Sequence, residues 1–175
     1  MKLARTLALA AVWLATIYAL VILERTWKCN LVQREVESST LRLAVALPDN
    51  PGVSRIARRN LELLGECRIF CTTSADWYMA SAANERLLGR NADAVAKYER
   101  ALAYDRRPEI YLNMGLAQLA AGQQVEGVRT LVLACIYNPE YLDEISDHNA
   151  EVRQARDEYQ LRMATRARGR RKGRD

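Results

Sequence analysis

The chain has 175 residues, of which 50% are hydrophobic and 27% are charged, and its formal net charge is +5. Seven basic residues and one acidic residue give residues 162–175 a net charge of +6, which leaves −1 for residues 1–161. The basic character therefore belongs to the C-terminal end, and this excludes a folded domain with a basic face.

The first predicted element is an apolar segment over residues 6–23 that contains no charged residue. Lys2 and Arg5 precede it, and Glu24, Arg25 and Lys28 follow it. A helix rises about 1.5 Å per residue, so this segment is close to the minimum length that crosses a bilayer core of about 30 Å. The sequence therefore predicts a single-pass membrane anchor within residues 1–28.

The alternative for this segment is a cleavable signal peptide, which has an apolar region of about 7 to 15 residues followed by small residues. Here Ile22 and Leu23 lead directly into Glu24, so a retained anchor is favoured. The short basic N-terminus favours a cytoplasmic start and places the remaining domain in the periplasm of a bacterial cell, although the flanking charges are nearly balanced.

Residues 29–74 are interpreted as a linker followed by leading helices. Apolar residues recur between Ser54 and Phe70, including Ile56, Leu61 and Leu64, and this spacing predicts one helix there.

An internal repeat follows the leading helices. Six positions recur at a constant interval of 33 residues (111 − 78 = 33). The pairs are Tyr78 with Tyr111, Ala82 with Gly115, Gly89 with Gly122, Ala94 with Gly127, Tyr98 with Leu131, and Ala101 with Ala134. Small residues at a helix crossing allow two helices to approach closely, and a glycine closes a helix C-terminus at little steric cost. Each copy therefore predicts two antiparallel helices joined by a glycine turn.

This pattern resembles the tetratricopeptide (TPR) repeat over residues 75–139, with departures at Ser81, Glu85 and Arg106. The resemblance implies an all-α fold with two repeats that hold another protein. Because two repeats are too few to be stable alone, the pattern also predicts a capping helix in residues 140–163. The predicted architecture is an N-terminal transmembrane helix followed by a TPR-like array with capping helices.

The resemblance implies a partner-binding groove on the first helix of each repeat. Its residues are Asp76, Met79, Ala83, Arg86, Leu112, Asn113, Leu116 and Leu119. Most of them are apolar, which favours an amphipathic helix of a partner protein over an acidic peptide. The alternative is that the leading helix or the C-terminal helix of the same chain already occupies this groove.

Residues 164–175 lack large apolar side chains and are predicted to be a disordered basic tail. An anionic lipid surface is one candidate partner, and nucleic acid is another only if the tail faces the cytoplasm. The remaining alternative is a solubilising tail without a fixed partner. Its basic residues are Arg166, Arg168, Arg170, Arg171, Lys172 and Arg174.

The four cysteines offer limited chemistry. In an oxidising compartment, a disulfide between Cys67 and Cys71, or one that involves Cys29, is compatible with their spacing. Cys135 is predicted to be a buried apolar residue. His148 is the single histidine, so the sequence predicts no metal site, no cofactor and no enzyme active site.

Together these features predict a membrane-tethered TPR adaptor or assembly factor, and the resemblance implies a role in envelope biogenesis, secretion or export. The alternatives are a structural subunit of a membrane complex, or a protein that binds lipid or nucleic acid through the arginine-rich tail.

Overall fold

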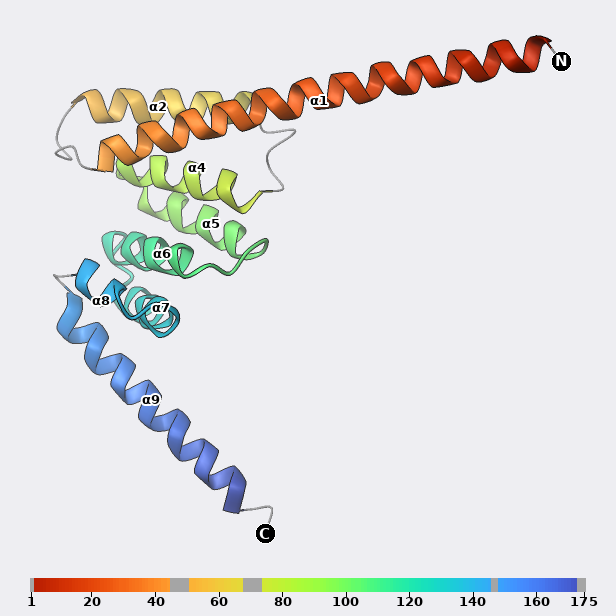
Figure 1. Cartoon of the computed structure of the whole chain (residues 1–175). Coiled ribbons are helices and arrows are strands. Elements are labelled where there is room, and N and C mark those ends of the chain that lie inside the picture. Colours follow the sequence, from red (N-terminus) through yellow and green to blue (C-terminus); the bar gives the residue numbers. More distant parts are fainter. Residues whose placement is uncertain (1, 45–50, 68–73, 146–147, 173–175) are drawn as a thin grey trace.

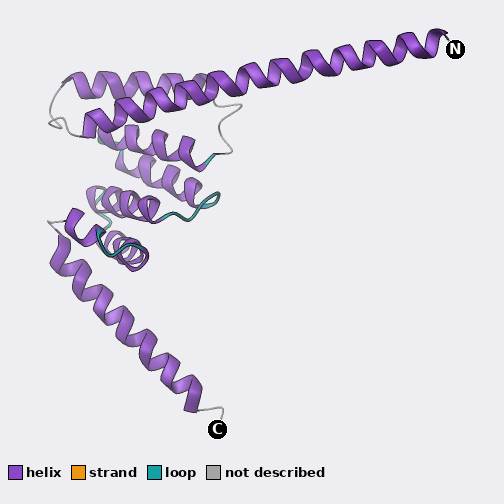
Figure 2. Cartoon of the chain, viewed as in Figure 1, coloured by secondary structure: helices purple, strands orange, loops and turns teal. Residues whose placement is uncertain are grey.

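The computed structural model describes residues 2–44, 51–67, 74–145 and 148–172. Figure 2 shows helices and loops, and no strand, among these residues, which confirms the all-α prediction. The helices are α1 (Lys2–Ala44), α2 (Pro51–Glu66), α4 (Ala75–Leu87), α5 (Asn91–Leu102), α6 (Pro108–Ala120), α7 (Gln124–Tyr137), α8 (Tyr141–Glu144) and α9 (Asn149–Lys172).

The two predicted repeats form the helix pairs α4–α5 and α6–α7, which stack on one another (Figure 1). Gly89 and Gly122 lie in the short turns of these pairs and have φ angles of +73° and +79°. Glycine adopts this left-handed region without the steric cost that a Cβ atom imposes. The helix-turn-helix interpretation of residues 75–139 is therefore confirmed at both turns.

The α6–α7 crossing depends on two glycines. A Cβ atom on Gly115 would lie 2.7 Å from Cγ of Leu131, and one on Gly127 would lie 2.6 Å from Cδ2 of Leu119. Both distances are far shorter than van der Waals contact, so only glycine permits this approach. In the α4–α5 pair, the buried side chains of Ala82 and Ala94 have the equivalent role.

Glu85, one of the departures from the TPR pattern, is buried in the α4–α5 pair. Its Oε1 atom lies 2.6 Å from Nζ of Lys97, and its Oε2 atom lies 3.4 Å from Nη1 of Arg90. A buried carboxylate is tolerated when it is paired in this way. An ion pair therefore occupies a place where an apolar contact was expected.

A third helix pair precedes the two repeats. The second half of α1 packs with α2 against α4, so the array starts at α1 (Figure 1). The apolar contact consists of Cys29, Val36, Leu64, Trp77 and Ala80. In addition, Nε1 of Trp77 donates a hydrogen bond of 3.2 Å to the carbonyl oxygen of Leu64. Residues 29–44 are therefore not a linker, because they continue α1 and cover the repeats.

Buried polar side chains link α1, α2 and α4. Nδ2 of Asn60 donates to Oδ1 of Asn84 at 2.9 Å, and Nδ2 of Asn84 donates to Oγ1 of Thr40 at 3.0 Å. Ser39 donates to Oδ1 of Asn60 at 3.0 Å. Buried amides stabilise a unique arrangement when they are paired, and they cost free energy when they are not. This network therefore determines the position of α1 on α4.

The C-terminal end of the array is capped by α8 and α9, as the repeat pattern predicted. Val152 of α9 and Ile145 join the apolar cluster of α6 and α7, and Nδ2 of Asn149 donates to the carbonyl oxygen of Leu142 at 2.6 Å.

The helix α9 continues to Lys172, so residues 164–172 have a helical backbone where the sequence predicted disorder. A helix that is already nucleated by packing extends at one hydrogen bond per added residue. The side chains from Arg166 to Arg174 lie outside what the structure describes.

The prediction of a membrane anchor is wrong. No helix in the described ranges is long and apolar enough to span a bilayer. The apolar segment over residues 6–23 is not a separate helix, because α1 continues without interruption through Glu24, Arg25 and Lys28. The prediction of a transmembrane helix is therefore wrong. The single-pass location and the periplasmic placement depended on that helix and are wrong with it.

We expect Gly115→Ala to lower the free energy of unfolding by about 1–3 kcal/mol, because the added methyl group overpacks a site beside the fully buried Leu131. The matched control is Gly65→Ala in α2, where an added Cβ meets no atom within 4 Å. Urea denaturation measures both. If Gly115→Ala is as stable as Gly65→Ala, the close crossing of α6 and α7 is incorrect.

We expect Asn84→Ala to lower the free energy of unfolding by about 2–3 kcal/mol, because it leaves the buried Asn60 amide with only the long contact to Oγ1 of Thr40. Asn30→Ala, at an exposed position of α1, serves as the control and should change stability by less than about 0.5 kcal/mol. Hydrogen exchange should show that the second half of α1 loses protection first. A neutral Asn84→Ala would show that the network does not hold α1.

Candidate protein-interaction face

The first half of the predicted groove lies on an accessible face of the array. Asp76 and Met79 are half-buried on α4 and both contact Arg107, which precedes α6. Ala83 is half-buried on the same helix, and the exposed Arg86 reaches Oδ1 of Asn113 on α6 at 3.5 Å. The structure therefore brings Arg86 and Asn113 together across α4 and α6, whereas Asp76 pairs with Arg107 instead.

The leucines of the predicted groove have a different role. Leu112 is buried in the cluster that contains Val132 of α7 and Val152 of α9, and Leu116 and Leu119 pack against the same cluster. Leu119 also fills the space beside Gly127. These leucines therefore pack on α7, the second helix of their own repeat, and α9 packs on α7. Occupation of the groove by the leading or the C-terminal helix stays a prediction.

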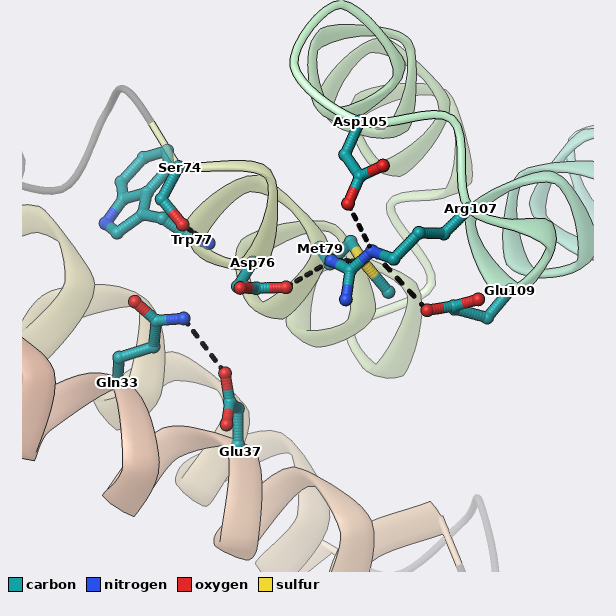
Figure 3. Close-up of polar contacts among 9 residues, drawn as sticks. All are labelled: Gln33, Glu37, Ser74, Asp76, Trp77, Met79, Asp105, Arg107 and Glu109. Carbon is teal, nitrogen blue, oxygen red and sulfur yellow. Dashed lines mark hydrogen bonds and ion pairs between the residues drawn. The ribbon is translucent and has the colours of Figure 1, made fainter.

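Arg107 is the centre of the polar part of the face (Figure 3). Its Nη2 atom pairs with Oδ1 of Asp76 and donates to Sδ of Met79 at 3.2 Å. Its Nε atom lies 2.9 Å from Oδ2 of Asp105 and 3.5 Å from Oε1 of Glu109. One guanidinium group therefore joins α4, the loop after α5 and the first turn of α6.

The charges around Arg107 do not balance. Burial opposes the charge of Arg107, but the hydrogen bond to Asp76 and the charges of Asp76, Glu109 and Asp105 outweigh this effect and raise the pKa of the guanidinium group. Three carboxylates face one cation, so the cluster keeps a surplus of negative charge. The Nε atom is buried and makes no hydrogen bond of good geometry with the described residues.

Helix α1 adds two polar residues that the sequence analysis missed. Nε2 of Gln33 donates to Oε1 of Glu37 at 3.0 Å, and Figure 3 shows both side chains on α1 beside the start of α4. Neither was a candidate, because residues 29–74 were interpreted as linker and leading helices. Residues 33 and 37 lie one helical turn apart, and that spacing would have placed them on one face had the helix been recognised.

The cysteines do not pair as the first of the two predicted disulfides, Cys67 with Cys71. Cys67 is a free thiol, so a Cys67–Cys71 disulfide is not formed, and Cys71 lies outside the described residues. Cys29 is buried and disulfide-bonded, which agrees with the second alternative. Cys135 is a free thiol in the α6–α7 core, as predicted. Burial raises the pKa of Cys67 and of Cys135, which disfavours their reactive thiolates.

Within the described ranges, no group of three or more histidine, cysteine, aspartate or glutamate side chains is arranged to hold a metal ion. His148 is half-buried just before α9. Comparisons with protein-family models, with curated proteins and with solved structures find no match to this chain.

We expect Arg107→Met to lower the free energy of unfolding by about 1 kcal/mol, since the side chain is one-third exposed and the pairs are partly screened by solvent. The loss should be larger in low salt, where the three remaining carboxylates repel one another most strongly. Arg86→Met is the control, because Arg86 is exposed and makes one long contact. Equal effects of the two substitutions at every salt concentration would show that Arg107 does not hold α4 to α6.

Proposed function

We propose that this protein is a helical-repeat adaptor of the TPR type that holds a segment of another protein against the face formed by α1, α4 and α6. Three lines support the proposal: the sequence repeat, the stacked helix pairs with glycine turns, and the caps at both ends. Repeat arrays of this kind bury a core between neighbouring helices and leave a continuous surface for a partner.

The observation that carries the proposal is the unbalanced charge cluster around Arg107. Packing alone does not require Asp105 and Glu109 beside a cation that Asp76 already pairs. Together with Glu37 and Gln33, these residues give the face acceptors that are held in position by other side chains. Such preorganisation lowers the entropy cost of binding a partner.

The chemistry of this face changes the expected partner. The sequence favoured an amphipathic helix because the groove contained leucines, but Leu112, Leu116 and Leu119 pack against the chain's own core. The accessible residues are mainly carboxylates and amides. We therefore propose a polar partner segment that carries lysine, arginine or other hydrogen-bond donors.

The test is site-specific photo-crosslinking in cells of the source organism. A photoreactive residue at Gln33 or at Asn113 should yield one discrete adduct with another protein, whose cross-linked segment is then identified by mass spectrometry. The same residue at Arg129, an exposed position of α7, is the control and should yield no such adduct. The adduct should also weaken when Asp76→Asn and Glu109→Gln are combined.

Absence of an adduct at both face positions, or an equally strong adduct at Arg129, would overturn the proposed function. An adduct that is unaffected by the two carboxylate substitutions would show that the charge cluster does not recognise the partner.

A further inference from the structure

The first half of α1 projects away from the array (Figure 1). It exposes large apolar side chains. A stripe of six residues stands out, with exposed fractions of 63% for Leu9, 67% for Trp13, 52% for Ile17, 60% for Leu20, 65% for Trp27 and 52% for Leu31. Folded chains rarely leave a continuous apolar patch larger than a few hundred Å² uncovered. This patch therefore requires an occupant.

The stripe lies on one face of the helix. Its members follow one another at intervals of three, four or seven residues, and successive residues are rotated by about 100°, so all six lie within about 80° of one another. Intervals that alternate between three and four residues are the spacing of helices that pair side by side. The stripe is about 33 Å long at about 1.5 Å per residue.

In the second half of α1, the side opposite the stripe belongs to the array, whereas in the first half it carries the exposed Tyr18 and Ile22. Cys29 and Val36 are buried against α2 and α4, and by the same rotation they point about 140–160° away from Trp13 and Leu31. Trp27 and Leu31 lie beside this packed region and are still more than half exposed. A helix docked on the stripe therefore does not collide with the array of its own chain.

We propose that a second copy of this chain covers the stripe, and that the two α1 helices pair in an antiparallel arrangement centred near Leu20. The stripe is symmetric about this point, because Leu20 lies midway between Leu9 and Leu31 and also midway between Trp13 and Trp27. Antiparallel pairing thus places Trp13 opposite Trp27 of the second copy. A two-fold axis requires this self-complementarity.

Glu24 determines the direction of pairing. It is the single charged residue within the stripe, and it forms an ion pair of 2.7 Å with Lys28 on the same helix. Parallel pairing would bring the two Glu24 side chains face to face, where like charges repel. Antiparallel pairing separates them by about 12 Å along the helix axis, since each lies four residues from the centre.

The available area is sufficient for a stable pair. Four tryptophans, each about two-thirds exposed, contribute roughly 400–650 Å² at about 150–250 Å² per aromatic side chain. The eight aliphatic side chains of the two stripes bring the total near the lower end of the area that specific protein interfaces bury.

The first experiment is sedimentation equilibrium of the full chain at about 10 μM. Interfaces of moderate affinity have dissociation constants near or below this concentration, so a dimer would be populated. We expect a mass of twice 19.8 kDa. Leu20→Asp should raise the dissociation constant at least 100-fold and yield a monomer whose array unfolds at the same temperature. Tyr18→Asp is the matched control, because Tyr18 is comparably exposed but lies outside the stripe, and it should leave the dimer intact.

Orientation is tested by cysteine substitution at single positions. Leu20→Cys should form a disulfide between copies under mild oxidation, whereas Trp13→Cys should not, because two-fold antiparallel pairing separates the two copies of residue 13. Cross-linking at both positions would overturn the antiparallel arrangement.

A monomer at this concentration, or equal sensitivity to Leu20→Asp and Tyr18→Asp, would overturn the dimer. Flotation of monomeric chains with phosphatidylcholine vesicles would also overturn it, since a lipid surface would then cover the stripe. None of these results bears on the photo-crosslinks at Gln33 and Asn113, so the proposed adaptor function stands or fails separately.

Discussion

The close approach of paired helices is the constraint on which the array depends. At the α6–α7 crossing, Leu131 fills the space over Gly115 and Leu119 fills the space over Gly127, so each glycine accommodates the leucine of the other helix. The α4–α5 pair reaches the same result with buried alanines. Because helix separation is determined by the side chains at the contact, these small residues determine how closely α4 approaches α5 and α6 approaches α7.

The same close stacking determines where polar groups can be placed. The amides of Asn60 and Asn84 are buried where α1 and α2 meet α4, and they bond to one another and to side chains of α1. This network places Gln33 and Glu37 beside the first turn of α4. Arg107 then joins α4 to α6 on that face. The stacking of α1, α2, α4 and α6 therefore both buries the core and positions the proposed interaction face.

Part of the predicted groove lies on one accessible face for a physical reason. Asp76, Met79, Arg86 and Asn113 lie on the first helices of the two repeats, and the repeat register is enough to place them on one face. Leu112, Leu116 and Leu119 follow the same register but pack against the apolar cluster that α6 forms with α7, and α8 and α9 close that cluster from the α7 side. Arg107 and Glu109 were missed because ion pairs between helices leave no periodic signal in the sequence.

Local chemistry determined the helix pairs directly from the sequence: glycine at each turn, small residues at each crossing and the constant interval between the two copies are properties of the chain itself. The fate of the apolar N-terminal segment and the extent of α1 depend on contacts between residues far apart in the chain. So do the third helix pair and the burial of Glu85. Hydrophobic periodicity records which face of a helix is apolar, but only the tertiary structure decides what covers that face, because the covering element has no fixed distance in sequence.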